Sequence, residues 1–399
     1  MISFKDAYKK VLDLYQDFGH EQVSLETAMG RILAEDIVAD RNFPPFNRAT
    51  KDGIAINYDS IEKGRTTFEI EGVLAAGMPP QPLLDASNCV EIMTGAVVPD
   101  NADTVVMYEH LVIENGSATL TKSPSRGQDI HICGSDQQKG DLVLKKYSTI
   151  TASEIGVLAA VGMASIKVRS LPKVAIVSTG NELVEVEEIP LPHQIRKSNI
   201  HTLYSALSEV GIVPTKLHLA DEKSSIKKAL DNTLQVHNAV LLSGGVSKGK
   251  FDFLPQVLEE LGVEKIFHGV FQRPGKPFWF GIQRETNTVV FSFPGNPVST
   301  FANYNVYFKD WLRRSLGIQI PKIGVILEEA VAVKGDLTML LRVKIRFNQG
   351  HLSASLVKEN GSGDLCSLVH TDGFIILEPK TDVYEVGELV PFVPTRDLL

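Results

Sequence analysis

Cysteine is scarce in this sequence, and its placement excludes several kinds of site. Only Cys89, Cys133 and Cys366 occur in 399 residues, far apart from one another. Their odd number and wide spacing fit neither a zinc-ligand pattern nor a redox pair. We therefore interpret them as structural thiols of a protein that works in a reducing compartment.

The sequence also lacks an apolar run long enough to span a bilayer, which argues against a membrane partner. Residues 1–6 lead directly into an amphipathic pattern, without the apolar core of a signal peptide. A hydrophobic content of 43% and a charged content of 22% are those of an ordinary globular protein. We expect the protein to be cytoplasmic.

Positive charge is not in excess either. The formal net charge of -8 argues against a broad nucleic-acid-binding surface, so we expect no nucleic-acid partner. A local basic pocket for a small anion is compatible with this charge. The expected ligand is therefore a small molecule.

What the sequence does contain indicates several domains, because 399 residues exceed what one hydrophobic core usually organises. A helical pattern covers residues 3–18 with Ser3 as its cap, and Thr151 to Glu154 form a capping box before a second apolar run. Between them, short β-branched runs separated by Gly, Pro and Asn predict an inserted β domain. We place a helical domain at residues 1–42 and 144–171, the inserted β domain at 43–143, an α/β domain at 172–318 and a β domain at 319–399.

The segment 172–318 alternates between strand and helix. Apolar runs at 174–177, 213–219 and 239–243 stand between amphipathic segments, which predicts a doubly wound parallel sheet covered on both faces. Ligands of such sheets bind outside the carboxyl ends of the strands. The loops at those ends, 178–182 and 243–250, are rich in small and polar residues, so we expect the binding site there.

The second of these loops nearly spells a P-loop. Phe251 stands where a magnesium-binding hydroxyl should be, which argues against nucleotide hydrolysis of that kind. The glycines, with Ser247 and Lys248, still suit an anion approached by backbone N–H groups, and a plain tight turn is the alternative. Asp252 follows, either as a helix cap or as a contact to metal or substrate.

Two further segments suit an anion. Arg273-Pro-Gly-Lys276-Pro277 holds two cations on a stiff turn, as a compact oxyanion requires, and a solvated basic turn is the alternative. The segment 294–297 precedes a helix at Val298-Ser299, whose free N–H groups and dipole favour an anion, and a structural strand-to-helix turn is the alternative.

Together these segments resemble the molybdopterin molybdenumtransferase (MoeA) family, which includes the E domain of gephyrin. The resemblance spans essentially the whole chain and rests on five motifs in the family's order. They are Ile92-Met-Thr-Gly-Ala96, Ser178-Thr-Gly-Asn-Glu-Leu183, Ser243-Gly-Gly-Val-Ser247, Pro274-Gly-Lys-Pro277 and Pro294-Gly-Asn-Pro-Val-Ser299. The resemblance implies an α/β multidomain fold with a helical segment, an inserted β domain, a doubly wound parallel-sheet α/β domain and a C-terminal β barrel, assembled as a homodimer.

The resemblance also implies a reaction, the insertion of molybdate into adenylylated molybdopterin with release of AMP, supported by Mg²⁺. Such a site must bring anions together with cations, backbone dipoles and a metal. For the pterin nucleotide and the anion it implies Gly244, Gly245, Ser247, Arg273, Lys276, Pro294, Asn296, Pro297, Ser299, Arg342 and Ser362. For the cation it implies Glu182, Asp221 and Asp252, whose hard carboxylate oxygens suit magnesium, and the first and last of these also count as catalytic.

Asp52 and Thr94 complete the catalytic set that the resemblance implies. In the family the corresponding residues of the inserted domain reach the pocket of the partner subunit, so a composite dimer site is expected. Turn chemistry is the alternative, since Asp and Thr before Gly commonly bond the local backbone. A molybdopterin adenylyltransferase is a possible partner that delivers the pterin.

Several positions depart from the family pattern. Asn47 replaces a carboxylate, Lys51 an apolar residue and His131 an arginine, while Lys197 and Lys250 stand where an acidic residue is usual and Arg273 replaces a frequent lysine. Together these replacements add positive charge near the expected site. The added charge is compatible with tighter anion binding, with a changed metal requirement or with a divergent paralogue. We interpret His131 as a surface or interface residue rather than a ligand.

Two other functions stay open on the sequence. A molybdopterin adenylyltransferase would need only the α/β domain, which leaves the flanking β domains unexplained. An inactive paralogue that serves as a scaffold is the other alternative, because the inserted-domain motif is altered.

Overall fold

The computed structural model describes residues 1–245, 253–333, 335–348 and 350–397. The chain divides into two compact units. The first comprises Met1–Glu21, Gly30–Ile32 and Val168–Leu399, and the second comprises Gln22–Met29 and Leu33–Lys167. The strands β1 (His20–Ser24) and β12 (Ser165–Arg169) lie at the boundary between them.

A six-stranded mixed sheet forms the centre of the first unit, with the strand order β16-β13-β17-β21-β20-β18. Its strands are β13 (Val174–Thr179), β16 (Thr215–Leu219), β17 (Ala239–Ser243), β18 (Val263–His268), β20 (Trp279–Gln283) and β21 (Thr288–Phe293). The first four strands in that order are parallel, as the α/β class predicts, whereas β20 pairs antiparallel with both of its neighbours, β21 and β18. The short turn 284–287 between β20 and β21 explains this difference, because a tight turn can join only antiparallel strands.

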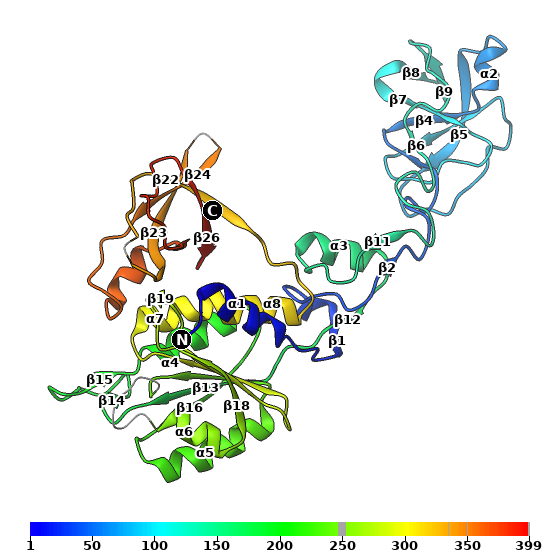
Figure 1. Cartoon of the computed structure of the whole chain (residues 1–399). Coiled ribbons are helices and arrows are strands. Elements are labelled where there is room, and N and C mark those ends of the chain that lie inside the picture. The colour runs from blue at the N-terminus through cyan, green and yellow to red at the C-terminus, as the bar shows by residue number, and fades with distance from the viewer. Residues whose placement is uncertain (246–252, 334, 349, 398–399) are drawn as a thin grey trace. The chain divides into compact units, whose positions relative to one another are not determined.

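Helices cover both faces of this sheet (Figure 1). They are α1 (Phe4–Asp13), α4 (Asn199–Ser208), α5 (Lys223–Val236), α6 (Leu254–Glu260), α7 (Pro297–Asn303), the π-helical turn η3 (Tyr304–Phe308) and α8 (Lys309–Ser315). Neighbouring strand residues point to opposite faces: Leu241 and Phe291 pack with α1, α4, α7 and α8, whereas Leu242 and Val290 pack with α5 and α6. The doubly wound arrangement is therefore confirmed.

The sequence predicts the ends of these helices better than their interiors. The Ser3 hydroxyl caps α1 by accepting a hydrogen bond from the Asp6 N–H at 3.1 Å, as predicted. The helix expected to start at Val298-Ser299 is present from Pro297, but the π-helical turn interrupts it at Tyr304–Phe308 before it continues to Ser315. Such turns are rare in proteins, and those that occur often lie at functional sites.

A closed five-stranded barrel follows, in agreement with the expected C-terminal barrel. Its strands are β22 (Ile323–Leu327), β23 (Thr338–Asn348), β24 (His351–Leu356), β25 (Gly373–Leu377) and β26 (Leu389–Pro394). The pairing of β23 with both β24 and β25 closes the ring. The short strand β19 (Gln272–Arg273) adds to β23 in parallel and so connects the α/β segment to the barrel. A 3-10 helix, η4 (Leu365–His370), lies between β24 and β25 in sequence.

The second unit is built on another six-stranded sheet, with the order β7-β4-β6-β5-β9-β8. Its strands are β4 (Gly53–Ile56), β5 (Thr67–Leu74), β6 (Cys89–Ile92), β7 (Thr104–Met107), β8 (Leu111–Glu114) and β9 (Ser117–Leu120). The other elements are η1 (Leu25–Thr27), β2 (Ile37–Val38), β3 (Arg48–Ala49), α2 (Asp59–Glu62), η2 (Tyr108–His110), β10 (Ile130–His131), β11 (Leu142–Leu144) and α3 (Ala152–Ala160). The predicted capping box at Thr151 and Glu154 starts α3.

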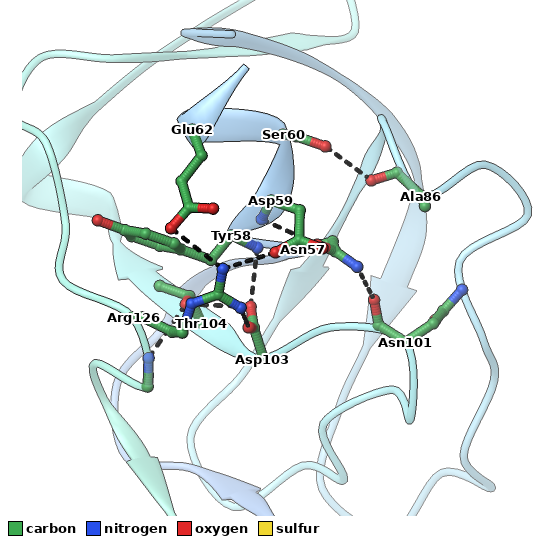
Figure 2. A network of polar contacts seen from close by, with 11 residues as sticks. Asn57, Tyr58, Asp59, Ser60, Glu62, Ala86, Asn101, Asp103, Thr104 and Arg126 are labelled. Carbon is green, nitrogen blue, oxygen red and sulfur yellow. Dashed lines mark hydrogen bonds and ion pairs between the residues drawn. The ribbon is translucent and has the colours of Figure 1, made fainter. Parts of the chain in front are cut away.

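One arginine holds the helix α2 against the sheet of this unit. Figure 2 shows Arg126 between the carboxylates of Asp59, Glu62 and Asp103, at 2.6, 3.3 and 2.8 Å. Its guanidinium also lies over the Tyr58 ring, 4.9 Å from the centroid. The network is exposed, so we interpret it as a local brace and not as a binding site.

No helix among the described residues is both long enough and apolar enough to cross a membrane.

Candidate active site

The larger cavity of the first unit lies at the carboxyl ends of β13, β17 and β21. Its volume is about 830 Å³. This is the edge at which open α/β sheets bind ligands. The predicted residues that line it are Glu182, Asp221, Gly244, Gly245, Pro294, Asn296 and Pro297.

Asn199 joins two of the loops at this edge. It is the first residue of α4, and its Nδ2 donates to Ser243 Oγ at 2.8 Å and to the Gly295 carbonyl oxygen at 2.7 Å. Ser243 ends β17 and Gly295 follows β21, so one amide fixes the spacing of both loops. The sequence analysis gave Asn199 no role. Its place at a helix start, directly after a polar pair, is the signal that was available.

The two glycines after β17 adopt a conformation that other residues rarely reach. Gly244 and Gly245 have φ values of 100° and 69°, and the Gly244 N–H donates to the Phe293 carbonyl oxygen at 3.1 Å. A Cβ on Gly245 would lie 2.7 Å from Leu254 Cδ1 and 3.0 Å from Thr179 Oγ1. The same two residues line the cavity, and residues 246–252 of this loop lie outside the described residues.

Thr179 brings a buried hydroxyl to the same edge. The residue is 5% exposed, and within the part of the chain that the structure describes its Oγ1 has no hydrogen-bond partner. Buried polar atoms are nearly always paired, so such an atom in a cavity wall suits a bound polar group. The sequence analysis quoted Thr179 only as part of a motif, because nothing in a sequence shows whether a hydroxyl is paired.

Two carboxylates stand on the wall of the cavity. The Asp221 carboxylate accepts a hydrogen bond from the Asn181 N–H at 3.3 Å, and the Asp221 N–H donates to the Asn181 side chain at 3.1 Å. Glu182 is accommodated by Gly180, since a Cβ there would lie 2.5 Å from its Oε2. Searched over the described residues, the chain shows no group of three or more His, Cys, Asp or Glu side chains arranged to hold a metal.

Lys197 adds a buried cation to this wall. The residue is 7% exposed, lines the cavity and pairs through Nζ with Glu185 Oε1 at 2.5 Å. The hydrogen bond from Lys197 lowers the pKa of Glu185, and the positive charge adds to the effect. The departure noted in the sequence thus places a lysine, already paired with Glu185, in the wall of the cavity that Glu182 and Asp221 line.

The start of α7 is less open to an anion than its sequence indicates. The Val298 N–H donates to the Ser362 carbonyl oxygen at 3.2 Å, so it is not free for a ligand. Asn296 Nδ2 donates to Ser362 Oγ at 2.8 Å. Ser299 is 3% exposed and does not line the cavity. These bonds support the alternative of a structural strand-to-helix turn, and they tie this turn to the barrel segment.

A second, smaller cavity of about 80 Å³ contains the predicted residues Arg273, Arg342 and Ser362. Its volume suits a compact oxyanion and excludes a pterin. Arg342 is 4% exposed and donates to Ser367 Oγ at 2.5 Å and to the Gly361 carbonyl oxygen at 3.2 Å. The Glu359 carboxylate forms an ion pair with it. Burial lowers the pKa of Arg342, although an arginine side chain stays charged.

The basic turn links the two cavities. Arg273 lines the smaller cavity and Pro277 the larger one. Lys276, between them in sequence, is exposed and lines neither of these cavities. The structure therefore divides the predicted anion-binding residues between two cavities, a division that no sequence pattern indicates.

The second unit brings Asp52 and Thr94 together. The Thr94 N–H and hydroxyl both donate to Asp52 Oδ1, at 2.6 and 2.7 Å. These two bonds hold the pKa of Asp52 below its usual value. These bonds join two segments that are 42 residues apart in sequence, so they are not the local turn bonding considered for these residues, and they leave an exposed carboxylate ionised.

The other altered residues of this unit form local contacts. His131 Nε2 lies 2.8 Å from Asp136 Oδ1, and its Nδ1 lies 3.1 Å from the Arg48 guanidinium. Asn47 Oδ1 accepts a hydrogen bond from the Cys133 N–H at 2.8 Å, and Lys51 is exposed. These contacts are consistent with His131 as a surface residue.

Four of the residues named in the sequence analysis of this loop, Ser247, Lys248, Lys250 and Asp252, lie outside the described residues, as does Phe251.

Comparison with known proteins gives one consistent answer over nearly the whole chain. Residues 2–162 match the MoeA N-terminal region (domain I and II), residues 175–314 a probable molybdopterin binding domain, and residues 325–395 the MoeA C-terminal region (domain IV). These three models in this order describe a protein class with a molybdopterin-binding α/β domain between two MoeA-specific regions.

Individual relatives agree with these models. A molybdopterin molybdenumtransferase of Synechocystis sp. is 35% identical over 98% of this chain and 99% of its own. One of Bacillus subtilis is 32% identical over 99% of this chain and 94% of its own. The crystal structure of a molybdopterin biosynthesis MoeA protein from Pyrococcus horikosii covers 100% of both chains with a TM-score of 0.84 and 31% identity. The chain belongs to the molybdopterin molybdenumtransferase (MoeA) family.

Proposed function

We propose that this protein is a molybdopterin molybdenumtransferase, which inserts molybdate into adenylylated molybdopterin and releases AMP. One observation carries the proposal. A large cavity at the strand ends and a small one that contains two arginines are joined by the single turn 273–277. The large cavity has room for a pterin nucleotide, and the small one suits a tetrahedral oxyanion. A site of this shape holds the two substrates of the insertion reaction next to each other.

The chemistry asked of the protein is mainly positioning and management of charge. Molybdate and the diphosphate of the adenylylated pterin are both anionic, so bringing them together costs free energy unless cations oppose them. Arg273 places positive charge at the smaller cavity, where Arg342 is paired with Glu359, and Lys197, paired with Glu185, lines the larger cavity. Preorganised charges of this kind need no rearrangement during the reaction. AMP leaves when a water molecule cleaves the phosphoanhydride.

A magnesium ion fits the larger cavity. Mg²⁺ is usually bound by one or two carboxylates together with substrate phosphates. Glu182 and Asp221 line the same cavity, and Gly180 leaves room for the first of these carboxylates. We propose that these two residues hold the ion, which would neutralise the diphosphate when bound.

We further propose that the protein acts as a homodimer, with the Asp52 and Thr94 pair of one subunit completing the site of the other. The support is that both donors of Thr94 keep the exposed Asp52 carboxylate ionised and fixed in direction. We place the enzyme in the cytoplasm, which its three unpaired cysteines support. A molybdopterin adenylyltransferase is the proposed supplier of the nucleotide.

The proposal is tested by incubating the purified full-length protein with adenylylated molybdopterin, Mg²⁺ and molybdate while AMP is measured. We expect release with the wild type and a higher Mg²⁺ requirement for Glu182→Gln. Glu187→Gln is the matched control, because Glu187 is exposed on the same segment and does not line the cavity. Absence of AMP release from a folded protein that still binds the nucleotide would support the scaffold alternative instead.

A further inference from the structure

We propose that a buried polar network of Tyr307, Gln272 and Asn303 positions the turn 273–277 for oxyanion binding. The inference deepens the proposed function and rests on it, because it assigns positioning residues to the proposed oxyanion site. None of the three side chains lines either of the two cavities described above. All three are completely buried, with exposed fractions of 0%.

The network consists of hydrogen bonds that converge on the turn. The Tyr307 hydroxyl donates to Gln272 Oε1. Gln272 Nε2 donates to Asn303 Oδ1 at 2.8 Å and to the Pro274 carbonyl oxygen at 3.0 Å. The Gln272 amide therefore connects the helix side chains of Tyr307 and Asn303 to the backbone of the turn at Pro274. Pro274 directly follows Arg273.

The network also fixes the turn by close packing. A Cβ on Gly275 would lie 2.7 Å from both the Asn303 Oδ1 and the Gln272 Nε2 atoms. Gly275 has a φ of 89°, a conformation that other residues rarely adopt. The turn thus rests directly on the two amides, so a change in their position moves Arg273 and Pro277 on either side.

Tyr307 reaches the network from the π-helical turn η3. A π-helical turn shifts the register of side chains along a helix and is frequent at functional sites. Tyr304, three residues earlier in the same turn, points elsewhere and donates to the Ala206 carbonyl oxygen at 2.9 Å. Burial raises the pKa of Tyr307 well above its usual value, so its hydroxyl stays protonated and remains a donor.

Asn303 gives a further sign that the network serves more than packing. Within the described part of the chain, its Nδ2 is buried without a hydrogen-bond partner. Such an unpaired buried donor is unfavourable for stability, and unfavourable buried groups are found preferentially where function requires a geometry. Positioning of Arg273 therefore accounts for both the buried Gln272 and the glycine at position 275.

The test compares two tyrosines of the same π-helical turn in the full-length protein. Tyr307→Phe removes the bond to Gln272, and Tyr304→Phe removes a partly buried bond to α4 that does not touch the turn. Calorimetric titration with molybdate alone measures oxyanion affinity, AMP titration measures the larger cavity, and thermal melting measures stability. We expect both variants to melt at similarly lowered temperatures. Only Tyr307→Phe should bind molybdate about tenfold more weakly, with AMP affinity unchanged.

Equal molybdate affinity of the two variants would overturn the inference, whether both match the wild type or both are weakened. Arg273→Met separates this failure from failure of the proposed function. If wild type binds molybdate and Arg273→Met does not, the oxyanion site stands and only the network is refuted. If wild type binds none, or Arg273→Met binds it as well as wild type, the proposed oxyanion site is wrong and the network inference falls with it.

Discussion

The substitution Gly245→Ala should distort the floor of the larger cavity at a cost that the structure predicts. Gly245 has a φ of 69°, and a left-handed conformation costs about 1 to 2 kcal/mol for a residue with a Cβ. The new methyl group would also lie 2.7 Å from Leu254 Cδ1, and Leu254 is 1% exposed in a close-packed core. Overpacking of this kind costs about 1 to 3 kcal/mol. The expected loss of stability is therefore about 2 to 5 kcal/mol.

Gly387→Ala is the matched control for this substitution. Gly387 has a φ of 86°, but a Cβ there would meet no atom within 4 Å. Its substitution should therefore cost only the conformational part, about 1 to 2 kcal/mol.

Urea unfolding followed by tryptophan fluorescence measures both variants, because Trp279 and Trp311 are buried in the two cores of the α/β sheet. Gly245→Ala should also weaken AMP binding, whereas Gly387→Ala should not. The reasoning is refuted if the two variants lose equal stability and bind AMP equally well.

Three further predictions concern the site. Asn199→Ala removes two hydrogen bonds between strand-end loops, so AMP affinity should fall about tenfold by calorimetry, and unchanged affinity would refute its bracing role. Thr94→Val removes one bond that lowers the pKa of Asp52, so the acid limb of the pH–activity profile should move to higher pH, and an unmoved limb would contradict a catalytic Asp52. Because folding lowers the pKa of Asp52, its bonds to Thr94 stabilise the folded protein at pH values above the usual pKa of 3.8. This stabilisation is lost as the pH falls through the lowered pKa of the folded state. Mixing Asp52→Asn protein with Arg273→Met protein should restore about a quarter of the wild-type activity. Half of the randomly mixed dimers contain one subunit of each kind, and one of the two composite sites in such a dimer is intact. No recovery would argue against a shared site.

Much of the fold follows from local sequence patterns. The boundaries of β17 (Ala239–Ser243) coincide with a predicted apolar run, and the caps at Ser3 and Thr151 start helices as expected. These features depend on residues close together in sequence, so a sequence displays them directly. The reversed strand β20 and the π-helical turn were missed, because strand direction and helix register depend on packing against distant residues.

The candidate site was foreseen in its residues more than in its arrangement. The loops after β13, β17 and β21 do line one cavity, as the rule for strand ends predicts. The sequence could not show that Arg273 and Arg342 belong to a separate small cavity, that Lys276 lines neither cavity, or that Ser299 is buried. The Gln272 network is a similar case, since its partners are 31 and 35 residues away and carry no local signal.

The proposed function requires that molybdate and the pterin nucleotide react with each other on this protein. The most direct measurement follows AMP release and molybdenum incorporation in the same reaction, with and without molybdate. The account predicts AMP release that depends on molybdate, with about one molybdenum atom incorporated for each AMP released and with loss of both in Arg273→Met. Adenylylation of free molybdopterin by ATP without molybdate, or nucleotide binding with neither AMP nor molybdenum product, would contradict it.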